Sequence, residues 1–282
     1  MIMETLFFSL VLIALIIGSV TDLKTREVPD QLNYFLIVSG LGLRTVLSII
    51  YSDPFVIIAG LMGFASMFAL AMFLFYTGQW GGGDAKLLMG LGAMIGMELS
   101  FTTFLVSFII NLIVVGAIFG LIYSIFLAYK HKTAFIKNWK NYPVRRFERY
   151  VVLAGLFPLL VGVFIPYALP LFALLTLLII GSYYVLIFMK VVEHVCMIKK
   201  IPISKLTEGD WIVEDVVVGG EHICGPSDLG ITDKQIERLK QLKIKEITIK
   251  EGMPFVPSFL VAYIITFYTG PWFVTLISGA LS

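Results

Sequence analysis

The sequence predicts an all-α polytopic membrane protein with about eight transmembrane segments and a small cytosolic α+β domain inserted before the last span. Three observations predict it. Hydrophobic residues make up 59% of the 282 residues and charged residues only 14%, which lies outside the globular range. The apolar residues form runs of membrane-spanning length, and the Lys and Arg residues gather between particular runs. The net charge of +2 does not indicate a nucleic-acid partner.

Six apolar runs are long enough to cross a bilayer core about 30 Å thick, which needs roughly 20 helical residues. They cover about residues 4–21, 33–51, 54–76, 100–129, 168–190 and 255–278. Two shorter runs, about 85–97 and 150–166, end at polar or proline residues such as Glu98 and Pro166. The first run is expected to stay as a span, because Glu4 opens the chain and no small-residue cleavage site follows the run.

The basic residues predict the orientation. If the loop with Lys24 and Arg26 is cytosolic and all eight runs cross, the other basic clusters also fall on the cytosolic side, and Arg44 is the exception. These clusters are Lys86; Lys130, Lys132, Lys137, Lys140, Arg145, Arg146 and Arg149; and the ten Lys and Arg residues from Lys190 to Lys250. We therefore expect eight spans with both termini outside, in the cytoplasmic membrane.

The polar links divide the chain into five parts. They are an N-terminal membrane bundle, 1–129; a basic cytosolic segment, 130–149; further membrane helices, 150–192; a cytosolic α+β domain, 193–253; and the last transmembrane helix, 254–282.

The segment 130–149 has an amphipathic pattern. Phe135, Ile136, Trp139 and Tyr142 recur at helical spacing among basic residues. This pattern predicts a helix that lies on anionic lipid, and the alternative is a solvated connecting loop.

The α+β domain has strand-like runs at Trp211–Val218 and Ile244–Ile249. Between them, Thr232 and Gln235 form a capping-box pattern that predicts a helix of about ten residues.

Asp22 is the first candidate for chemistry, because an ionisable residue beside a spanning helix is costly and suggests a function. It ends the first apolar run, where the negative end of the helix dipole disfavours an acid. The alternative is an interfacial acid paired with Lys24 or Arg26.

Asp84 is the second candidate. It follows three glycines, Gly81–Gly83, which permit unusual backbone angles and the close approach of another chain, as a peptide site requires. One alternative is a phosphate-binding turn, although no strand precedes it and the Ser or Thr of such a loop is missing. The other is a flexible turn in which Asp84 is the helix N-cap.

The predicted topology puts Asp22 and Asp84 at the same membrane depth, so that their side chains could meet. Two facing carboxylates share one proton, which is the working state of an aspartic protease. The two helix ends then favour Asp84 as the initial base and Asp22 as the initial acid, within a pair whose titrations are coupled.

Two stretches resemble the type IV prepilin and preflagellin peptidases, which are Gly-x-Gly-Asp aspartyl proteases. They are Gly81–Asp84 followed by Ala85-Lys86, and Asp22-Leu-Lys-Thr-Arg-Glu-Val-Pro29-Asp30. The resemblance covers about residues 1–130 well and the remainder loosely, where Gly252-Met-Pro254-Phe-Val-Pro257 is similar to the C-terminal part of archaeal members.

The resemblance implies that Asp22 and Asp84 are the catalytic dyad. Substrate-binding or motif residues would be Gly81, Gly83, Lys86, Pro254 and Pro257. For the two prolines, the alternative is a role in starting the last helix.

The implied substrate is a pilin-like or flagellin-like precursor with a short basic leader that ends in glycine before a long apolar helix. Cleavage would take place at the cytosolic membrane face. The N-terminal insert with paired Cys-x-x-Cys motifs that many bacterial members carry is absent, so we expect peptidase activity without methyl transfer and without a cofactor.

His194, Cys196, His222 and Cys224 repeat a His-x-Cys pattern. Four such side chains could form a zinc site, but the spacing is not that of a usual finger, and chance packing is the favoured interpretation. Whether they bind a metal stays open.

Two other classes of function remain. In a transporter, Asp22 and Asp84 would bind an ion or proton, although such sites lie near the bilayer midplane. A presenilin-like protease of other substrates would share the glycine motif, but the residues around Asp22 argue against it.

Overall fold

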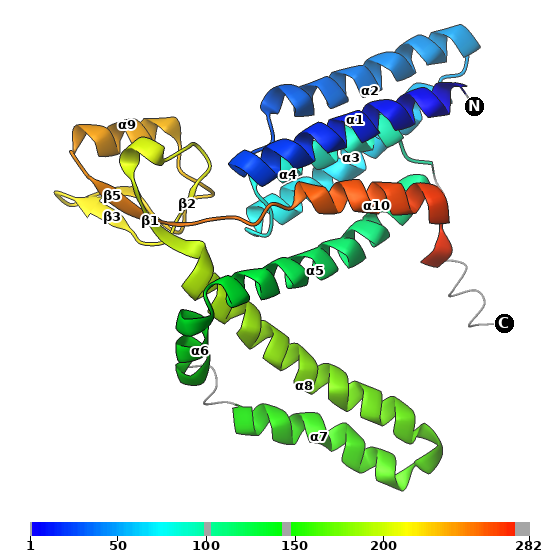
Figure 1. Cartoon of the computed structure of the whole chain (residues 1–282). Coiled ribbons are helices and arrows are strands. Elements are labelled where there is room, and N and C mark those ends of the chain that lie inside the picture. The colour runs from blue at the N-terminus through cyan, green and yellow to red at the C-terminus, as the bar shows by residue number, and fades with distance from the viewer. Residues whose placement is uncertain (1, 99–102, 143–147, 274–282) are drawn as a thin grey trace.

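Helices form most of the chain in the computed structural model, which describes residues 2–98, 103–142 and 148–273 (Figure 1). The helices before the sheet region are α1 (Ile2–Thr25), α2 (Asp30–Tyr51), α3 (Phe55–Tyr76), α4 (Gly82–Ile95), α5 (Phe104–Lys130), α6 (Lys132–Asn141), α7 (Glu148–Phe164) and α8 (Leu169–Val192). A short 3-10 turn, Pro166–Ala168, connects α7 to α8, and a π-helical turn, Glu193–Met197, follows α8.

Five helices of the described chain are long and apolar enough to cross a membrane. They are Thr5–Thr25, Asp30–Tyr51, Phe55–Tyr76, Phe104–Lys130 and Pro166–Met197. Three further helices are shorter: α4 and α10 have 14 residues each and α7 has 17. A 14-residue helix is about 21 Å long, less than the roughly 30 Å of a bilayer core. The number of eight spans therefore remains a prediction.

The last helix, α10 (Val256–Thr269), is shorter than the predicted span of 255–278. It ends at Gly270, which has a φ of +56°, and Pro271 follows, so two helix-terminating residues stand in succession. Residues 274–278 of this predicted span lie outside the described residues. The same is true of residues 100–102 of the predicted span 100–129 and of residues 143–147 of the basic segment.

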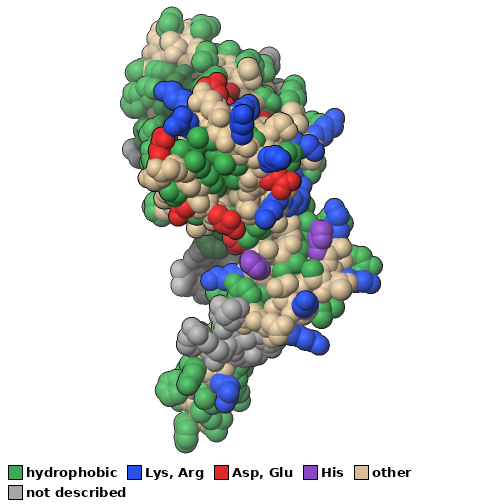
Figure 2. Space-filling model, turned by 90° about the vertical axis from the view of Figure 1, so that its left-hand side faces the viewer, with side chains coloured by type: hydrophobic (Ala, Val, Ile, Leu, Met, Phe, Trp, Pro, Cys, Tyr) green, Lys and Arg blue, Asp and Glu red, His purple; other side chains and the backbone are tan. Residues whose placement is uncertain are grey.

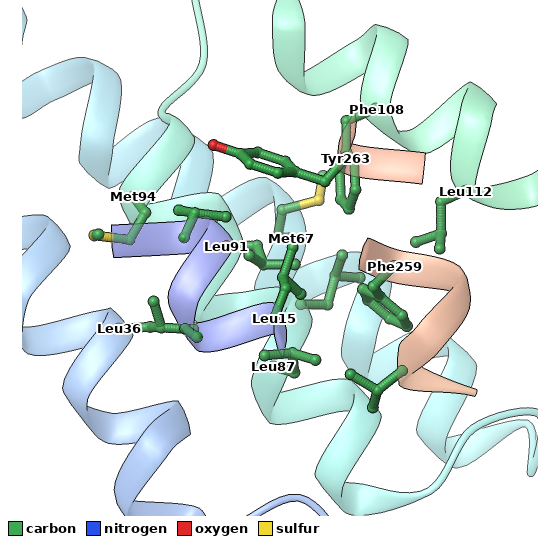
Figure 3. Packing of buried hydrophobic residues seen from close by; sticks show 14 of the residues in the cluster. Leu15, Leu36, Met67, Leu87, Leu91, Met94, Phe108, Leu112, Phe259 and Tyr263 are labelled. Atoms are coloured by element: carbon green, nitrogen blue, oxygen red, sulfur yellow. The ribbon is translucent and has the colours of Figure 1, made fainter. Parts of the chain in front are cut away.

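Helix α4 forms the centre of the membrane bundle, although it is one of the shortest helices. Its buried residues include Leu87, Leu88, Leu91 and Met94. Figure 3 shows how Leu87, Leu91 and Met94 meet side chains from the surrounding helices. The labelled neighbours are Leu15 of α1, Leu36 of α2, Met67 of α3, Phe108 and Leu112 of α5, and Phe259 and Tyr263 of α10.

Small residues allow α4 to fit between α2 and α3. A Cβ atom on Gly92 of α4 would overlap the backbone of Gly63 on α3, and a Cβ atom on Gly40 of α2 would come within 2.9 Å of the Ala93 carbonyl carbon. Close backbone approach through such residues is typical of helix packing in membranes.

Arg44, the basic residue that departs from the predicted charge pattern, caps the C-terminal end of α4. From α2, its guanidinium donates to the carbonyl oxygens of Ala93 at 3.2 Å, Met94 at 3.0 Å and Ile95 at 2.6 Å. The last carbonyls of a helix have no partner within the helix, and a cation there also complements the helix dipole. The unpaired carbonyl oxygens at the end of the short helix α4 therefore explain why a basic residue lies at this position.

We predict that Arg44→Met lowers the free energy of unfolding by about 2–4 kcal/mol, because several carbonyls at the end of α4 lose their donor. Thermal unfolding in detergent, followed by circular dichroism, measures the change. The matched control is Lys137→Met on the exposed helix α6. Equal melting temperatures for Arg44→Met and the wild type would contradict this role of Arg44.

The hairpin of α7 and α8 diverges from the bundle (Figure 1). Helix α6 lies at the base of this hairpin, where Phe135 stacks on Trp139 at 5.8 Å and meets Phe188 of α8 edge-on at 5.5 Å between ring centroids. Ile136 on the same helix is 52% exposed. The predicted amphipathic segment is thus helical over Lys132–Asn141, and its Phe135 packs against α8. Contact with lipid stays a prediction.

The sheet region follows α8. Strands β1 (Ile198–Pro202), β5 (Glu246–Lys250) and β2 (Trp211–Ile212) form an antiparallel sheet in the order β1-β5-β2, in which Ile198 pairs with Lys250. Strands β3 (Val216–Val218) and β4 (Glu221–Cys224) form a separate hairpin. Helix α9 (Asp233–Gln241) packs its Ile236 and Leu239 into the core of this region.

The predicted local patterns are partly correct here. The capping box of Thr232 and Gln235 is confirmed in both of its halves. The predicted strand Trp211–Val218 is two strands, because Val213–Asp215 lie outside regular structure between β2 and β3. Strands β1 and β4 were not predicted, and the second predicted strand is shifted to Glu246–Lys250.

The start of α1 and the end of α10 lie at the end of the bundle opposite to the sheet (Figure 1). The sheet end carries Lys, Arg, Asp and Glu side chains close together, as Figure 2 shows. Along the helices, in contrast, large apolar side chains such as Ile49, Ile122 and Phe157 are exposed by 73%, 62% and 65%. The charged sheet end suits water, and the apolar helix surfaces suit lipid.

Candidate active site

Asp22 lies in the last turn of α1 and is buried, with only 5% of its surface exposed. Its Oδ2 accepts a hydrogen bond of 2.8 Å from the backbone N–H of Val256, the first residue of α10. The first N–H groups of a helix lack partners within the helix, so a carboxylate at this position caps α10. Asp22 therefore joins two segments that are 234 residues apart in the sequence.

Asp84 is the third residue of α4, and the N-cap is Gly81. The interpretation of Asp84 as the N-cap is thus wrong, because the three glycines start the helix earlier than expected. The Gly81 backbone donates to the Asp84 carboxyl, and the charge of Asp22 acts on the same group. Asp84 is partly exposed, unlike Asp22. The two acids lie near enough for their charges to interact.

Two contacts fix the start of α4 against the link between α1 and α2. A Cβ atom on Gly83 would lie 3.4 Å from the Cβ of Val28, so the glycine backbone itself packs on this link. Lys86 Nζ forms an ion pair with Asp30 at 2.7 Å. The two sequence stretches that carry the acids are thus packed on each other, and Lys86 serves this packing.

Trp80 connects the glycine turn to α10. Its ring lies 5.5 Å from Phe255 and 5.3 Å from Phe259, measured between centroids. The start of α10 therefore contacts both halves of the site, through Val256 at Asp22 and through Phe255 at the turn before Asp84. Neither Trp80 nor Val256 was predicted as a site residue, since only the contact across the sequence reveals their place.

Pro254 and Pro257 flank this contact. Pro254 is a buried residue of the link before α10, and Pro257 is the second residue of the helix. Proline is tolerated in the first turn because the missing N–H would have no partner within the helix. This explains Pro257 as a helix-start residue beside Asp22. Direct contact of either proline with a substrate stays a prediction.

The assignment of base and acid from helix ends needs revision. That argument considered only the helix to which each acid belongs. The N-terminus of α10 adds a backbone donor at Asp22, so both carboxyls receive a main-chain hydrogen bond near a helix start. Hydrogen bonds of this kind favour an ionised carboxyl. Helix polarity alone therefore does not decide which acid holds the shared proton.

The sheet region packs on the turn before Asp84. The Trp211 ring of β2 lies against Gly78, where a Cβ atom would come within 3.1 Å of the ring, and Gly78 has a φ of +69°. Asp210 next to it is within range of Glu27 in the link after α1. Burial raises the pKa of Asp210, and the neighbouring Glu27 and Glu251 carboxylates raise it further. The sheet region therefore packs on the turn before Asp84 and lies within electrostatic range of the link after α1.

We predict that Trp211→Ala increases amide hydrogen exchange at residues 77–81 by about tenfold, as expected for the loss of roughly 1.4 kcal/mol of local stability. Val217→Ala is the matched control, because Val217 is 56% exposed on β3. Exchange measured by mass spectrometry on the protein in detergent tests this contact. Unchanged exchange at residues 77–81 in Trp211→Ala would show that Trp211 does not hold the turn.

The cysteines of the two His-x-Cys pairs lie in separate apolar cores, whereas His194 and His222 are exposed. Cys196 packs with Ala128 and Val192, whereas Cys224 belongs to the core of the sheet region. His222 Nε2 lies 3.1 Å from Asp215. Among the described residues, no group of three or more His, Cys, Asp or Glu side chains could hold a metal ion.

Comparison with known proteins points to one family. Residues 9–125 match the model of the type IV leader peptidase family, a range that includes Asp22 and Asp84. The preflagellin peptidase of Methanocaldococcus jannaschii is 43% identical over 83 residues, which are 29% of this chain and 35% of that protein. The preflagellin peptidase of Methanococcus voltae is 36% identical over 88 residues, 31% of this chain and 37% of that protein.

The chain is similar over a longer stretch to the prepilin peptidase EppA of Methanothermobacter thermautotrophicus. The two are 27% identical over 169 residues, 55% of this chain and 44% of that protein. The chain thus spans between 35% and 44% of the length of these relatives.

Proposed function

We propose, from the match of residues 9–125 to the type IV leader peptidase family, that this chain is a membrane aspartyl endopeptidase. It removes the short basic leader of type IV pilin-like or archaeal flagellin precursors, and its catalytic residues are Asp22 and Asp84. The relatives are themselves named preflagellin and prepilin peptidases.

The observation that carries this proposal is the meeting of two acids from separate helices. Asp22 at the end of α1 and Asp84 at the start of α4 interact electrostatically, although they are distant in sequence. The charge of Asp22 acts on the Asp84 carboxyl, and this interaction supports a shared role for the two acids. Two carboxyls at close range cannot both ionise cheaply, so the pair retains one proton.

The chemistry follows from this shared proton. The ionised carboxylate takes a proton from a water molecule, whose oxygen attacks the carbonyl carbon of the scissile peptide bond. The protonated carboxyl donates to the carbonyl oxygen, which gives a neutral tetrahedral diol. Collapse of the diol breaks the C–N bond as a proton passes to the leaving nitrogen, and one proton remains on the pair.

The location at the cytosolic membrane face is part of the proposal. Its support is the gathering of basic residues towards the end of the molecule that carries the sheet, in keeping with the positive-inside bias. On this topology the precursor helix lies in the bilayer, and its basic leader lies in the cytosol near anionic lipid headgroups. The scissile bond is then close to the surface, where water reaches Asp84.

Peptidase activity without methyl transfer is also proposed. The basis is the sequence of residues 1–130, which lacks an insert with paired Cys-x-x-Cys motifs: the two cysteines of the chain are Cys196 and Cys224. No cofactor enters the proposed reaction.

We predict that Asp22→Asn and Asp84→Asn each lower the cleavage rate by about 10²–10⁴-fold, because either change removes an acid–base group. Membranes that contain wild type or variant are incubated with a panel of pilin-like and flagellin-like precursors, and the products are separated by gel electrophoresis and identified by mass spectrometry.

The matched control is Asp53→Asn. Asp53 is also an acid before a helix start, where it accepts from the Phe55 N–H at 2.9 Å, but it precedes α3 at the other end of the bundle. This variant should cleave like wild type. Full cleavage by Asp22→Asn or Asp84→Asn would refute the dyad. Wild-type membranes that cleave no precursor in the panel would refute the proposed substrate class.

A further inference from the structure

Arg26 has an unusual backbone conformation one helical turn after Asp22. Its φ is +64°, a value rarely adopted by residues other than glycine, and its N–H donates to the Asp22 carbonyl oxygen at 3.0 Å. A non-glycine residue in this conformation is strained and persists only where its surroundings hold it. The surroundings of Arg26 therefore hold its backbone in place at the end of α1.

Tyr123 of α5 holds one side of the Arg26 guanidinium. Arg26 Nη2 donates to the Tyr123 hydroxyl at 2.8 Å, and the guanidinium carbon lies 5.5 Å from the centre of the ring. This contact connects the end of α1 to α5. It uses one of the two terminal nitrogens of the guanidinium.

The other terminal nitrogen, Nη1, is buried and has no hydrogen-bond partner among the described residues. Leaving a charged donor buried without a partner costs free energy, and native structures rarely contain such groups without a reason. Anchoring α1 to α5 does not explain it, since Nη2 alone makes that bond. The positive charge of Arg26 also acts on the Asp22 carboxyl, so the guanidinium lies within electrostatic range of the proposed dyad.

A peptide substrate needs hydrogen-bond donors of this kind. Around the scissile bond the chain has to be extended, so its carbonyl oxygens lose their helical partners and, within the site, also lose water. Each such oxygen then needs a donor from the enzyme. Arginine is suited to this task because it stays charged at any working pH and carries several donors in a fixed plane.

We propose that Arg26 is a substrate-binding residue whose Nη1 donates to a main-chain carbonyl oxygen of the precursor, at a peptide bond next to the scissile one. This inference rests on the proposed peptidase function. Arg26 holds the extended chain in register with Asp22 and Asp84, and Tyr123 keeps its guanidinium in place.

The test pairs an enzyme change with a single-atom substrate change. Precursor peptides are made with one thioamide each, at the non-scissile bonds on either side of the cleavage site, because sulfur accepts hydrogen bonds more weakly than oxygen. At one position the thioamide should lower kcat/KM of the wild type by about tenfold, the loss expected for a bond to a charged donor. Arg26→Lys keeps the charge but lacks the guanidinium fork, so its kcat/KM with the oxygen substrate should be lower than that of the wild type. The thioamide at that position should then lower the kcat/KM of Arg26→Lys only slightly further.

The design separates a binding role from a structural one. If Arg26 only anchors α1 to α5, Arg26→Lys slows cleavage of oxygen and sulfur substrates by the same factor, and equal thioamide penalties at every position would overturn the inference. If Arg26→Lys does not accumulate in membranes, Arg26→Gln is used in the same comparison. A wild type that cleaves no precursor would instead refute the proposed function itself.

Discussion

The hydrogen bond from the Val256 N–H to Asp22 is the contact on which the site depends. It joins the end of α1 to the start of α10 and satisfies a backbone donor that would otherwise be unpaired. Because Trp80 packs on Phe255 and Phe259, the same helix start also holds the glycine turn before Asp84. One helix terminus thus positions the surroundings of both acids.

The short helix α4 shows how the bundle accommodates an acid at the start of a central helix. Glycines let its backbone lie against α2 and α3, and its leucines fill the core, so α4 needs little lipid contact. A helix of this kind can begin inside the bundle, with its first turn and Asp84 close to the charged end. The start of α4, rather than a loop on the surface, then carries the acid.

Much of this organisation could be predicted from the sequence. The apolar runs indicate most helices within a few residues, and the basic clusters put Asp22 and Asp84 at one end of the bundle before any contact is known. The capping box of Thr232 and Gln235 is a local signal and is correct. Contacts between distant segments could not be predicted in this way. The residues around Val256 and Trp211 in the sequence carry no pattern that indicates contact with Asp22 or Gly78. The short strands β1 and β4 were missed for the same reason, since they form only with β5 and β3 as partners.

Arg44 and Lys86 lie at opposite ends of α4, and each connects it to α2: Arg44 through the last carbonyls of α4, Lys86 through Asp30 at the start of α2. Both ends of α4, with Asp84 in its first turn, are thus held against α2 by side-chain contacts. Asp22 is held instead by the start of α10, through the Val256 N–H. The two acids therefore belong to different sets of contacts, which meet where Gly83 packs on Val28.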